Sequence, residues 1–346
     1  MLELRQPEGA FARIEAYLRD RGFFAPGGEE LEADLYLGYG LSAPLRRRRS
    51  PLPPEPAPLP LAAVRVRERG EIVLQEHNPL TIGSWQRSWA DSDYAEAVEA
   101  VRTAIGRGDV YQVNLVQHLS ADFGGDPAPL AARLAAFGPR SLAGAGWAIV
   151  SASPELFLAR RGRRVWTSPI KGTRPLGEHV EGEKDSAEHV MIVDLERNDL
   201  SRVCEHGSVR WPELMVEREL AGVTHLVSTV EGRLRENVGL AELLAATFPG
   251  GSVTGAPKIA AVDLIAELEP VGRGASMGAL GVVRGNGDLE LALTIRTFAI
   301  ADGRIHLWVG GGIVWDSEPD AEIEESWTKA GPLLAAIGAP VEAVTR

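Results

Sequence analysis

The chain has 346 residues, of which 45% are hydrophobic, and its formal net charge is −12. This length and composition are typical of a globular protein with one large core or two moderate ones. The acidic balance argues against nucleic acid binding, which needs a basic surface, and the single cysteine, Cys204, excludes a disulfide framework and a cysteine-rich zinc site.

The N-terminus lacks the basic start and apolar run of a signal peptide, and the sequence has no run of 18 or more apolar residues. We therefore expect a soluble protein without membrane contact. A cytoplasmic location is expected because a lone cysteine suits a reducing compartment.

Residues 1–85 carry few chemical signals. We expect a helix over residues 11–19 and a strand pair over residues 61–73, so that this region contributes to the sheets of a catalytic domain over residues 90–343. The basic run Arg46 to Arg49 and the proline-rich segment 51–60, PLPPEPAPLP, are predicted to be exposed and extended.

After residue 90 the pattern is more regular. YAEAVEAVRTAIGRGD predicts an amphipathic helix, with Asp91 or Ser92 as its cap and Gly106 or Gly108 as its end. VYQVNLVQHLSADF predicts an alternating strand. Three later segments predict helices: KDSAEHVMIVDLERND, GAPKIAAVDLIAELEP and PDAEIEESWTKAGPLLAAIG.

The segment SPELFLARRGRRVWTSPIKGT predicts a hairpin. Its apolar runs flank a turn near Gly162, and Glu155 and Lys171 lie almost equally far from that turn. Pairing of the two arms in that register would place the carboxylate and the ammonium group side by side at the open end.

A second hairpin is predicted in DLELALTIRTFAIADGRIHLWVGGG, with its turn at Asp302 and the glycine that follows. Alternate apolar residues from Leu289 to Ile295 share one face, which puts Thr294 and Arg296 together on the other. Arg296 would there be solvated or aimed at an anion. Hairpins separated by helices predict an α+β fold, with antiparallel sheets and helices packed on them.

Acidic residues in two predicted helices suggest a metal site. Glu322, Glu325 and Lys329 share a face of the last helix because they are three and four residues apart. Glu188 lies at the edge of an apolar face of an earlier helix. Two glutamates from different helices suit Mg²⁺, which keeps several waters, but spacing alone favours a solvated ladder of charges.

Glycine-rich segments suggest close approach of a ligand to the backbone. In FPGGSVTGAPK the lysine does not follow the glycine directly, which excludes a nucleotide-binding loop, although the N–H groups at this helix start could hold a carboxylate or phosphate. The glycines at 310–312 end a strand and indicate either a bulge or a ligand contact. For His189 and His225, both in apolar segments, a core role is the default.

Seven segments together resemble the chorismate-utilising enzymes, in the family's order and over roughly residues 92–335. They are SPELF, PIKGTRP, KDSAEHVMIVDLERNDLSRV, THLVSTVEG, FPGGSVTGAPK, IRT and GGGIVWDSEPDAEIEESWTK. The resemblance implies that the α+β fold is a sandwich of two antiparallel sheets packed face to face, with helices outside and the site between the sheets.

The resemblance also implies roles for individual residues. Mg²⁺ would be held by Glu188 and Glu325, with Glu322 nearby acting through water, and Glu155 matches the general acid that protonates the departing C4 hydroxyl of chorismate. The positions that match substrate-binding residues are His225, Ser252, Arg296, Gly310, Gly312 and Lys329.

Two positions separate the branches of the family. Water-adding members carry a lysine base where this chain has Gln112, and glutamine cannot serve as a base, so isochorismate and salicylate synthesis are disfavoured. Anthranilate synthases usually have alanine where this chain has Lys171, as aminodeoxychorismate synthases do. The resemblance therefore favours that branch, in which the lysine attacks C2 and ammonia then adds at C4. Anthranilate synthase component I is the alternative, and a non-catalytic chorismate-binding protein is a distant one.

The catalytic interpretation sets a condition on two protonation states. Lys171 must be a neutral amine to be nucleophilic, and Glu155 must be protonated to act as an acid. Cys204 lacks the context of a glutaminase nucleophile, so ammonia would come from solution or from a separate subunit. The resemblance implies the second source, a glutamine amidotransferase subunit. Ser276 stands where the family often has an aromatic residue, and the N-terminal region shows no clear tryptophan site.

Overall fold

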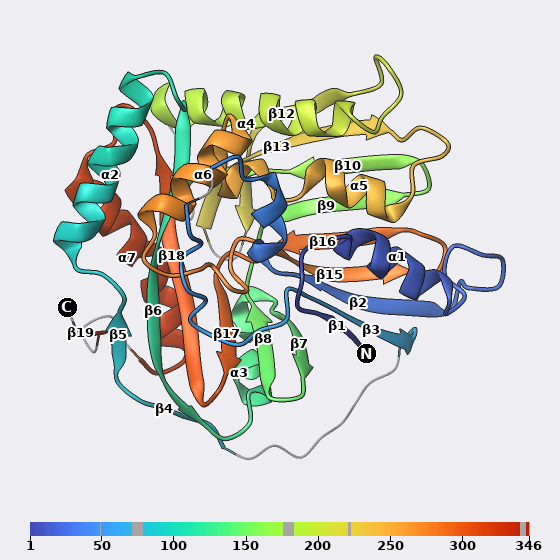
Figure 1. Ribbon diagram of the computed structural model, residues 1–346, viewed down its shortest axis with the longest axis horizontal. Coiled ribbons are helices and arrows are strands. Elements are labelled where there is room, and N and C mark those ends of the chain that lie inside the picture. The colour runs from blue at the N-terminus through green and yellow to red at the C-terminus, as the bar shows by residue number, and fades with distance from the viewer. Residues whose placement is uncertain (49, 71–78, 176–182, 221–222, 340–343, 346) are drawn as a thin grey trace.

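The computed structural model describes residues 1–48, 50–70, 79–175, 183–220, 223–339 and 344–345. Within these ranges the strands form one sheet of ten strands and one of nine. Within the described residues, neighbouring strands of the larger sheet are antiparallel, and in the smaller sheet the short pair β5–β19 is parallel. The predicted α+β fold with two antiparallel sheets and helices is confirmed (Figure 1).

The strands of the larger sheet lie one below another on the right-hand side of Figure 1, with the N-terminal strands at the lower end. Strand β12 (Arg210–Leu220) pairs with β13 outside the main path. The path itself is β1 (Leu2–Leu4), β3 (Ala62–Glu68), β2 (Leu31–Leu37), β15 (Ala279–Arg284), β16 (Leu289–Leu293), β9 (Leu156–Arg161), β10 (Arg164–Ser168), β13 (Val223–Arg233) and β11 (Ile170–Pro175).

The smaller sheet is built on the long strands β6 and β18, which are paired from Val113 opposite Ile313 to Asp122 opposite Arg304. Two short strands, β4 (Thr81–Ile82) and β14 (Gly255–Ala256), pair with β6 beside this path. The path is β19 (Val344–Thr345), β5 (Trp85–Arg87), β6 (Gln112–Gly124), β18 (Arg304–Ile313), β17 (Thr297–Ala301), β8 (Trp147–Ser151) and β7 (Arg140–Gly144).

The helices lie around the two sheets (Figure 1). The α-helices are α1 (Ala10–Arg19), α2 (Asp91–Gly106), α3 (Ala128–Arg133), α4 (Glu183–Ser201), α5 (Leu240–Thr247), α6 (Lys258–Leu268) and α7 (Pro319–Ala336). The 3₁₀ helices are η1 (Tyr39–Leu45), η2 (Ala135–Phe137) and η3 (Gly251–Val253). All five helices predicted from the sequence are present, although α2 begins at Asp91, so that Ala90 occupies its cap position.

Two hydrophobic cores hold these layers together. The larger core joins both sheets to α1, α2, α4, α5 and α6, and the buried residues Ala10, Ile14 and Leu18 of α1 follow the helical spacing of four. The smaller core lies under α3 and the end of α7, where Leu130 and Leu333 pack with Phe298 of β17. The smaller sheet is therefore buried on both faces.

The first predicted hairpin forms, but its register at the open end was wrong. Strands β9 and β10 pair around Gly162, with Arg161 opposite Arg164. The chain then leaves the hairpin at Pro169 and enters β11, where Lys171 lies opposite Leu226 of β13. A proline cannot donate to the ladder, which is consistent with the change of partner strand at this point.

The second predicted hairpin is correct only for β17 and β18. Strand β16 belongs to the larger sheet and β17 to the smaller one, so residues 294–296 cross between the sheets. Arg296 has a φ of 50°, a left-handed conformation that is uncommon outside glycine. Thr294 and Arg296 therefore do not share a strand face, because the chain turns between the two sheets.

Two predictions for the N-terminal region need correction. Arg46 is buried rather than solvated, with its Nε 3.8 Å from Oδ1 of Asp263 in α6. The backbone N–H groups of Arg47 and Arg48 donate to the same carboxylate. Of the predicted strand pair at 61–73, β3 ends at Glu68, and residues 71–78 lie outside the described residues. Strands β1 to β3 belong to the larger sheet.

A buried ion pair joins several of these elements. Arg273 is 2% exposed, and its Nε and Nη2 donate to the two carboxylate oxygens of Glu269 at 2.8 and 2.7 Å. The guanidinium group also donates to the backbone carbonyl groups of Val253 and Asn114. The carboxylate in turn accepts the N–H of Val116 at 3.1 Å. One ion pair thus fixes the loop at η3 against β6.

We expect Arg273→Met to lower the free energy of unfolding by about 3–5 kcal/mol, because it leaves the Glu269 carboxylate buried without its cation. Denaturant unfolding at neutral pH measures this loss. The control is the double variant Arg273→Met with Glu269→Leu, which should recover part of the stability. If the free energy of unfolding of Arg273→Met lay within about 1 kcal/mol of the wild-type value, the structural role of this pair would be contradicted.

Candidate active site

The predicted site residues come from separate elements that meet where the two sheets adjoin. Lys171 lies on β11, Glu188 on α4 and His225 on β13, while Arg296 follows β16. The others lie just before β9, in η3, at the end of β18 and on α7: Glu155, Ser252, Gly310, Gly312, Glu322, Glu325 and Lys329. The fold therefore gathers residues that are up to 174 positions apart in the sequence, from Glu155 to Lys329.

Lys171 faces an acidic partner from α4. Its Nζ lies 3.8 Å from Oε2 of Glu188, and the two side chains are only 12% and 13% exposed. Strand β11 is fixed in place by β13, where Ile170 and Lys171 lie opposite Val227 and Leu226. The amine of Lys171 is thus largely buried and is held beside one carboxylate.

Glu155 lies close to Lys171, although not through the predicted strand pairing. It is 5% exposed, and the hydroxyl of Ser252 donates to its Oε1 at 2.6 Å. Burial raises the pKa of Glu155, while the hydrogen bond from Ser252 and the charges of Lys171 and Arg296 act in the opposite direction. The raised pKa favours the protonated form that an acid catalyst requires.

Arg296 and His225 border the same space. Burial lowers the pKa of the Arg296 guanidinium, and the nearby Glu155 partly offsets this. The Nδ1 of His225 lies 2.8 Å from the carbonyl oxygen of Gly172 and donates to it. Burial also lowers the pKa of His225, with further lowering by Arg296 and Lys329. His225 is therefore neutral near pH 7, and its neighbours supply positive charge suited to an anionic ligand.

The glycines of β18 let other groups approach the backbone. A Cβ atom on Gly310 would collide with the carbonyl oxygen of Leu115, and one on Gly312 would collide with the Gln112 amide. The same Cβ on Gly312 would lie 3.6 Å from Nζ of Lys171. The run of glycines is thus explained by close contacts at these positions, and it places Gln112 and Lys171 next to one point of the strand.

Helix α7 presents its charged face to Gly311, the middle glycine of the run. A Cβ on Gly311 would lie 3.2 Å from Oε2 of Glu322, 3.3 Å from Oε1 of Glu325 and 3.5 Å from Nζ of Lys329. Nζ of Lys329 lies 2.6 Å from Oε1 of Glu325 and donates to the carbonyl oxygen of Gly310 at 2.9 Å. The predicted sharing of one helix face is confirmed, and Glu322 is buried at 3% exposure.

Two further polar side chains near Lys171 have no hydrogen-bond partner within the described part of the chain. Both amide atoms of Gln112 and both ring nitrogens of His189 are buried in this state, and each residue is 0% exposed. Burial and the charge of Lys171 lower the pKa of His189 to about 4, so its imidazole is neutral. A buried polar group without a partner is costly, which indicates that a ligand completes this part of the site.

Sequence reasoning missed an acidic group behind the site. Glu196 of α4 is 3% exposed, and its Oε1 accepts the N–H of Gly251 at 2.9 Å. This N–H lies at the start of η3, and not at the start of α6 for which an anion was suggested from the sequence. The available signal was spacing, because Glu196 comes four residues after the buried Ile192 and so lies on the buried face of α4.

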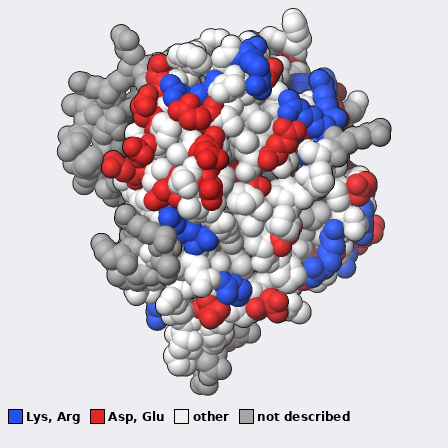
Figure 2. Space-filling model, turned by 60° about the vertical axis from the view of Figure 1, so that its left-hand side comes forward, with Lys and Arg blue, Asp and Glu red and all other residues white. Residues whose placement is uncertain are grey.

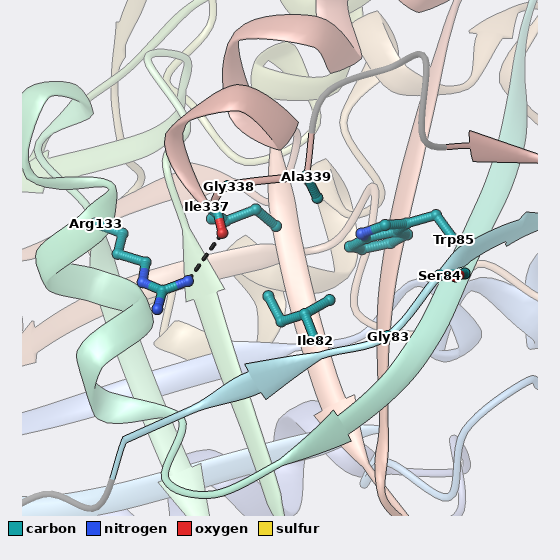
Figure 3. Close-up of a pocket in the computed structure, with 8 residues that line it drawn as sticks. All are labelled: Ile82, Gly83, Ser84, Trp85, Arg133, Ile337, Gly338 and Ala339. Carbon is teal, nitrogen blue, oxygen red and sulfur yellow. Dashed lines mark hydrogen bonds between the residues drawn. The ribbon is translucent and has the colours of Figure 1, made fainter.

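A separate hollow lies far from these residues in the fold. Its volume is about 440 Å³, and Nη1 of Arg133 donates to the Ile337 carbonyl oxygen at its edge, at 2.8 Å (Figure 3). No predicted site residue is among those that line it: Ile82, Gly83, Ser84, Trp85, Arg133, Ile337, Gly338 and Ala339. We therefore do not assign it to the candidate site.

The face shown in Figure 2 carries acidic and basic side chains interspersed, with the acidic ones gathered over one part of it. This face has no continuous basic patch of the kind that nucleic acid binding needs. Among the described helices, none combines the length and the apolar character needed to span a membrane.

Residues 56–335 match the family described as chorismate binding enzyme. The match begins within the region 1–85 that was predicted to precede the catalytic domain.

Aminodeoxychorismate synthase component 1 of Escherichia coli is 41% identical over 282 residues, which cover 77% of this chain and 62% of that protein. Anthranilate synthase component 1 of Streptomyces coelicolor is 40% identical over 269 residues, covering 73% of this chain and 53% of that protein. The chain thus spans about half to three-fifths of the length of these relatives. The crystal structure of anthranilate synthase component I from Streptococcus pneumoniae superposes with a TM-score of 0.75 at 27% identity, covering 87% and 80% of the two chains.

The protonation of Glu196 predicts how stability depends on pH. Burial, followed by the nearby Asp199, raises the pKa of Glu196 from 4.5 to about 8. The folded state therefore binds a proton that the unfolded state has lost, and the free energy of unfolding should fall as the pH rises from about 5 to 8. Glu196→Gln should flatten this fall and be the more stable protein at pH 8. Denaturant unfolding at several pH values measures this fall. Equal slopes of the unfolding free energy against pH in the wild-type protein and in Glu196→Gln would contradict the raised pKa of Glu196.

Proposed function

The chain belongs to the chorismate binding enzyme family, and we propose that it aminates chorismate at C4 as component I of an aminodeoxychorismate synthase. The observation that carries the proposal is the position of Lys171. Its amine is largely buried, lies beside Glu188, and is close enough to Glu155 to affect the pKa of that acid. The lysine and the acid required for C4 chemistry thus face one space.

The proposed reaction uses the two groups in turn. The neutral Lys171 Nζ bonds to C2 as the C4–O bond breaks and both ring double bonds shift, and Glu155 gives its proton to the hydroxyl, which leaves as water. Ammonia then bonds to C4, both double bonds shift back, and the C2–N bond to Lys171 breaks. The new ammonium group returns a proton to Glu155, so chorismate and ammonia give 4-amino-4-deoxychorismate and water.

The unpartnered Gln112 amide supports an ammonia-using enzyme over a water-adding one. Glutamine can donate and accept hydrogen bonds but cannot remove a proton from water at neutral pH. Its amide faces the same point of β18 as Lys171. Neutral ammonia is a strong enough nucleophile to add without a base, unlike water, so it needs only orientation, and the buried amide offers an acceptor for it.

We propose that Mg²⁺ is held by Glu188 and Glu325, with Glu322 nearby. The described residues contain no group of three or more His, Cys, Asp or Glu side chains placed to hold a metal, but Mg²⁺ commonly uses one or two carboxylates and several waters. Lysine side chains lie beside two of these carboxylates, Lys171 beside Glu188 and Lys329 beside Glu325. The donor set fits such an ion, which when bound would neutralise and hold a substrate carboxylate.

The ammonia source is proposed to be a separate glutamine amidotransferase subunit. The relatives are named as component 1 of their synthases, which implies a second component. The one cysteine of this chain, Cys204, is buried, and burial raises the pKa of its thiol to about 11. A buried, protonated thiol is unsuited to glutamine hydrolysis.

Anthranilate synthesis remains the competing activity, because the relatives carry both names at similar identity. It would add ammonia at C2 and then eliminate pyruvate. The position of Lys171 favours C4 amination, since a lysine bonded at C2 occupies the carbon that anthranilate synthesis must aminate.

Lys171→Ala should reduce C4 amination by at least about 10³-fold, because no nucleophile remains to activate C4. Purified protein with chorismate, Mg²⁺ and ammonium measures this, with the product identified by mass and fluorescence. Arg218→Ala, an exposed change on β12, serves as the control and should retain wild-type turnover. Anthranilate as the main wild-type product, or unchanged C4 amination by Lys171→Ala, would overturn the proposal.

Glu325→Gln should raise the Mg²⁺ concentration needed for half-maximal turnover by at least about tenfold, because one of the two proposed carboxylate ligands loses its charge. Direct Mg²⁺ binding by calorimetry gives a second readout. Glu324→Gln, on the neighbouring and exposed position of α7, is the matched control. Equal Mg²⁺ dependence in the two variants would exclude Glu325 as a ligand.

A further inference from the structure

Glu196 is a buried acid that the proposed reaction does not use. It lies on α4, two helical turns after Glu188, and it is as buried as a core residue. Burying a carboxyl group is costly unless it is hydrogen-bonded. Oε1 of Glu196 accepts the N–H of Gly251, so the acid acts on the loop that contains Gly251.

That loop carries the hydroxyl that contacts Glu155. Gly251 and Ser252 are consecutive residues of η3, and the Ser252 Oγ donates to the Glu155 Oε1 at 2.6 Å. A short connection therefore runs from Glu196 through one peptide unit and one hydroxyl to Glu155. Each step is buried, since Gly251, Ser252 and Glu155 are all buried.

The contact at Gly251 has little freedom to change. A Cβ atom on Gly251 would lie 2.6 Å from Cδ2 of Leu195, a separation that real Cβ atoms essentially never show, and a tight 3.0 Å from Oε1 of Glu196. Helix α4 thus presses directly on the backbone of η3. The other restraint on this loop is Arg273, which donates to the carbonyl oxygen of Val253 on its far side.

The charges around Glu196 favour its protonated form. Asp199 of α4 lies on the same buried face and raises the pKa of Glu196, with a smaller contribution in the same direction from Glu155. Lys258 of α6 opposes them and forms an ion pair with Asp199. A neutral Glu196 still accepts the N–H of Gly251, and it leaves no second negative charge beside Glu155.

We propose that Glu196 is a positioning residue for the acid catalyst: by holding the Gly251 N–H, it aims the Ser252 hydroxyl at Glu155. This inference rests on the proposed role of Glu155. Loss of the acceptor at position 196 would let η3 shift, and the Ser252 hydroxyl would then no longer reach Glu155. Lys171 and Arg296, the cations that face Glu155, would stay in place.

The contact between Ser252 and Glu155 affects how turnover depends on pH. The hydrogen bond from Ser252 stabilises the ionised form of Glu155, so its loss should raise the pKa of that acid. Turnover requires the protonated acid and therefore falls as the pH rises through this pKa. Removing the contact should move the alkaline limb of the profile to higher pH while lowering the maximal rate.

The test compares Glu196→Ala, Glu196→Gln and Ser252→Ala by the rate of chorismate consumption between pH 6 and 10. Glu196→Ala should lower kcat by about 10- to 100-fold and move the alkaline limb upward by roughly half a unit to one unit. Glu196→Gln keeps an acceptor oxygen and should stay within about twofold of the wild-type rate. Ser252→Ala should reproduce the limb shift of Glu196→Ala.

Leu200→Ala is the control for damage to α4. Leu200 is 1% exposed and belongs to the larger hydrophobic core. Its truncation should therefore lower the stability of the protein without moving the alkaline limb of the pH profile of turnover. The double variant Glu196→Ala with Ser252→Ala should be no slower than the slower single variant, because both changes break one connection. Additive effects, or an unmoved limb in Glu196→Ala, would refute the inference.

The positioning role of Glu196 and the amination of chorismate at C4 would fail on different results. Chorismate consumption is followed whatever the product, so formation of anthranilate would sink C4 amination while the comparison of variants remains valid. If no variant consumes chorismate, the same double-variant cycle is measured by denaturant unfolding. Non-additive unfolding free energies would support the connection from Glu196 to Ser252, and additive ones would refute it.

Discussion

The Arg273–Glu269 ion pair is the constraint on which the arrangement of the site depends. The guanidinium group holds the carbonyl groups of Val253 and Asn114, and the carboxylate holds the N–H of Val116. These contacts join the loop at η3 to β6, and hence the loop that contacts Glu155 to the strand that carries Gln112. Both partners are fully desolvated, so neither is stable in this place without the other.

The site shows how a sandwich of sheets brings together side chains of opposite charge. Glu155 and Lys171 belong to the larger sheet, Gln112 and the glycines of β18 to the smaller one, and α4 and α7 add carboxylates. Burial favours the neutral form of three ionisable groups at the site, Glu155, His189 and His225. The raised pKa of Glu155 and the lowered pKa values of His189 and His225 have this common cause.

Much of this organisation could be predicted from residue patterns, because period and turn chemistry are local properties. Gly162 marked the first hairpin correctly, and the acidic face of α7 followed from spacing. What could not be predicted was which strands pair after a break. After Pro169 the chain pairs with β13 and not with β9, so that Lys171 lies opposite Leu226. At Arg296, which has a left-handed conformation, the chain crosses from one sheet to the other. Glu196 was missed because its importance depends on the position of Gly251, 55 residues later.

The crossover at Arg296 has a mechanical consequence. The three residues 294–296 are a direct covalent link between β16 and β17, and so between the two halves of the sandwich. Hydrogen bonds fix both ends of this link, because the N–H of Thr294 donates to the carbonyl oxygen of Gly278 and the carbonyl oxygen of Arg296 accepts the N–H of Ala152. The link therefore ties the two halves of the sandwich together at Arg296.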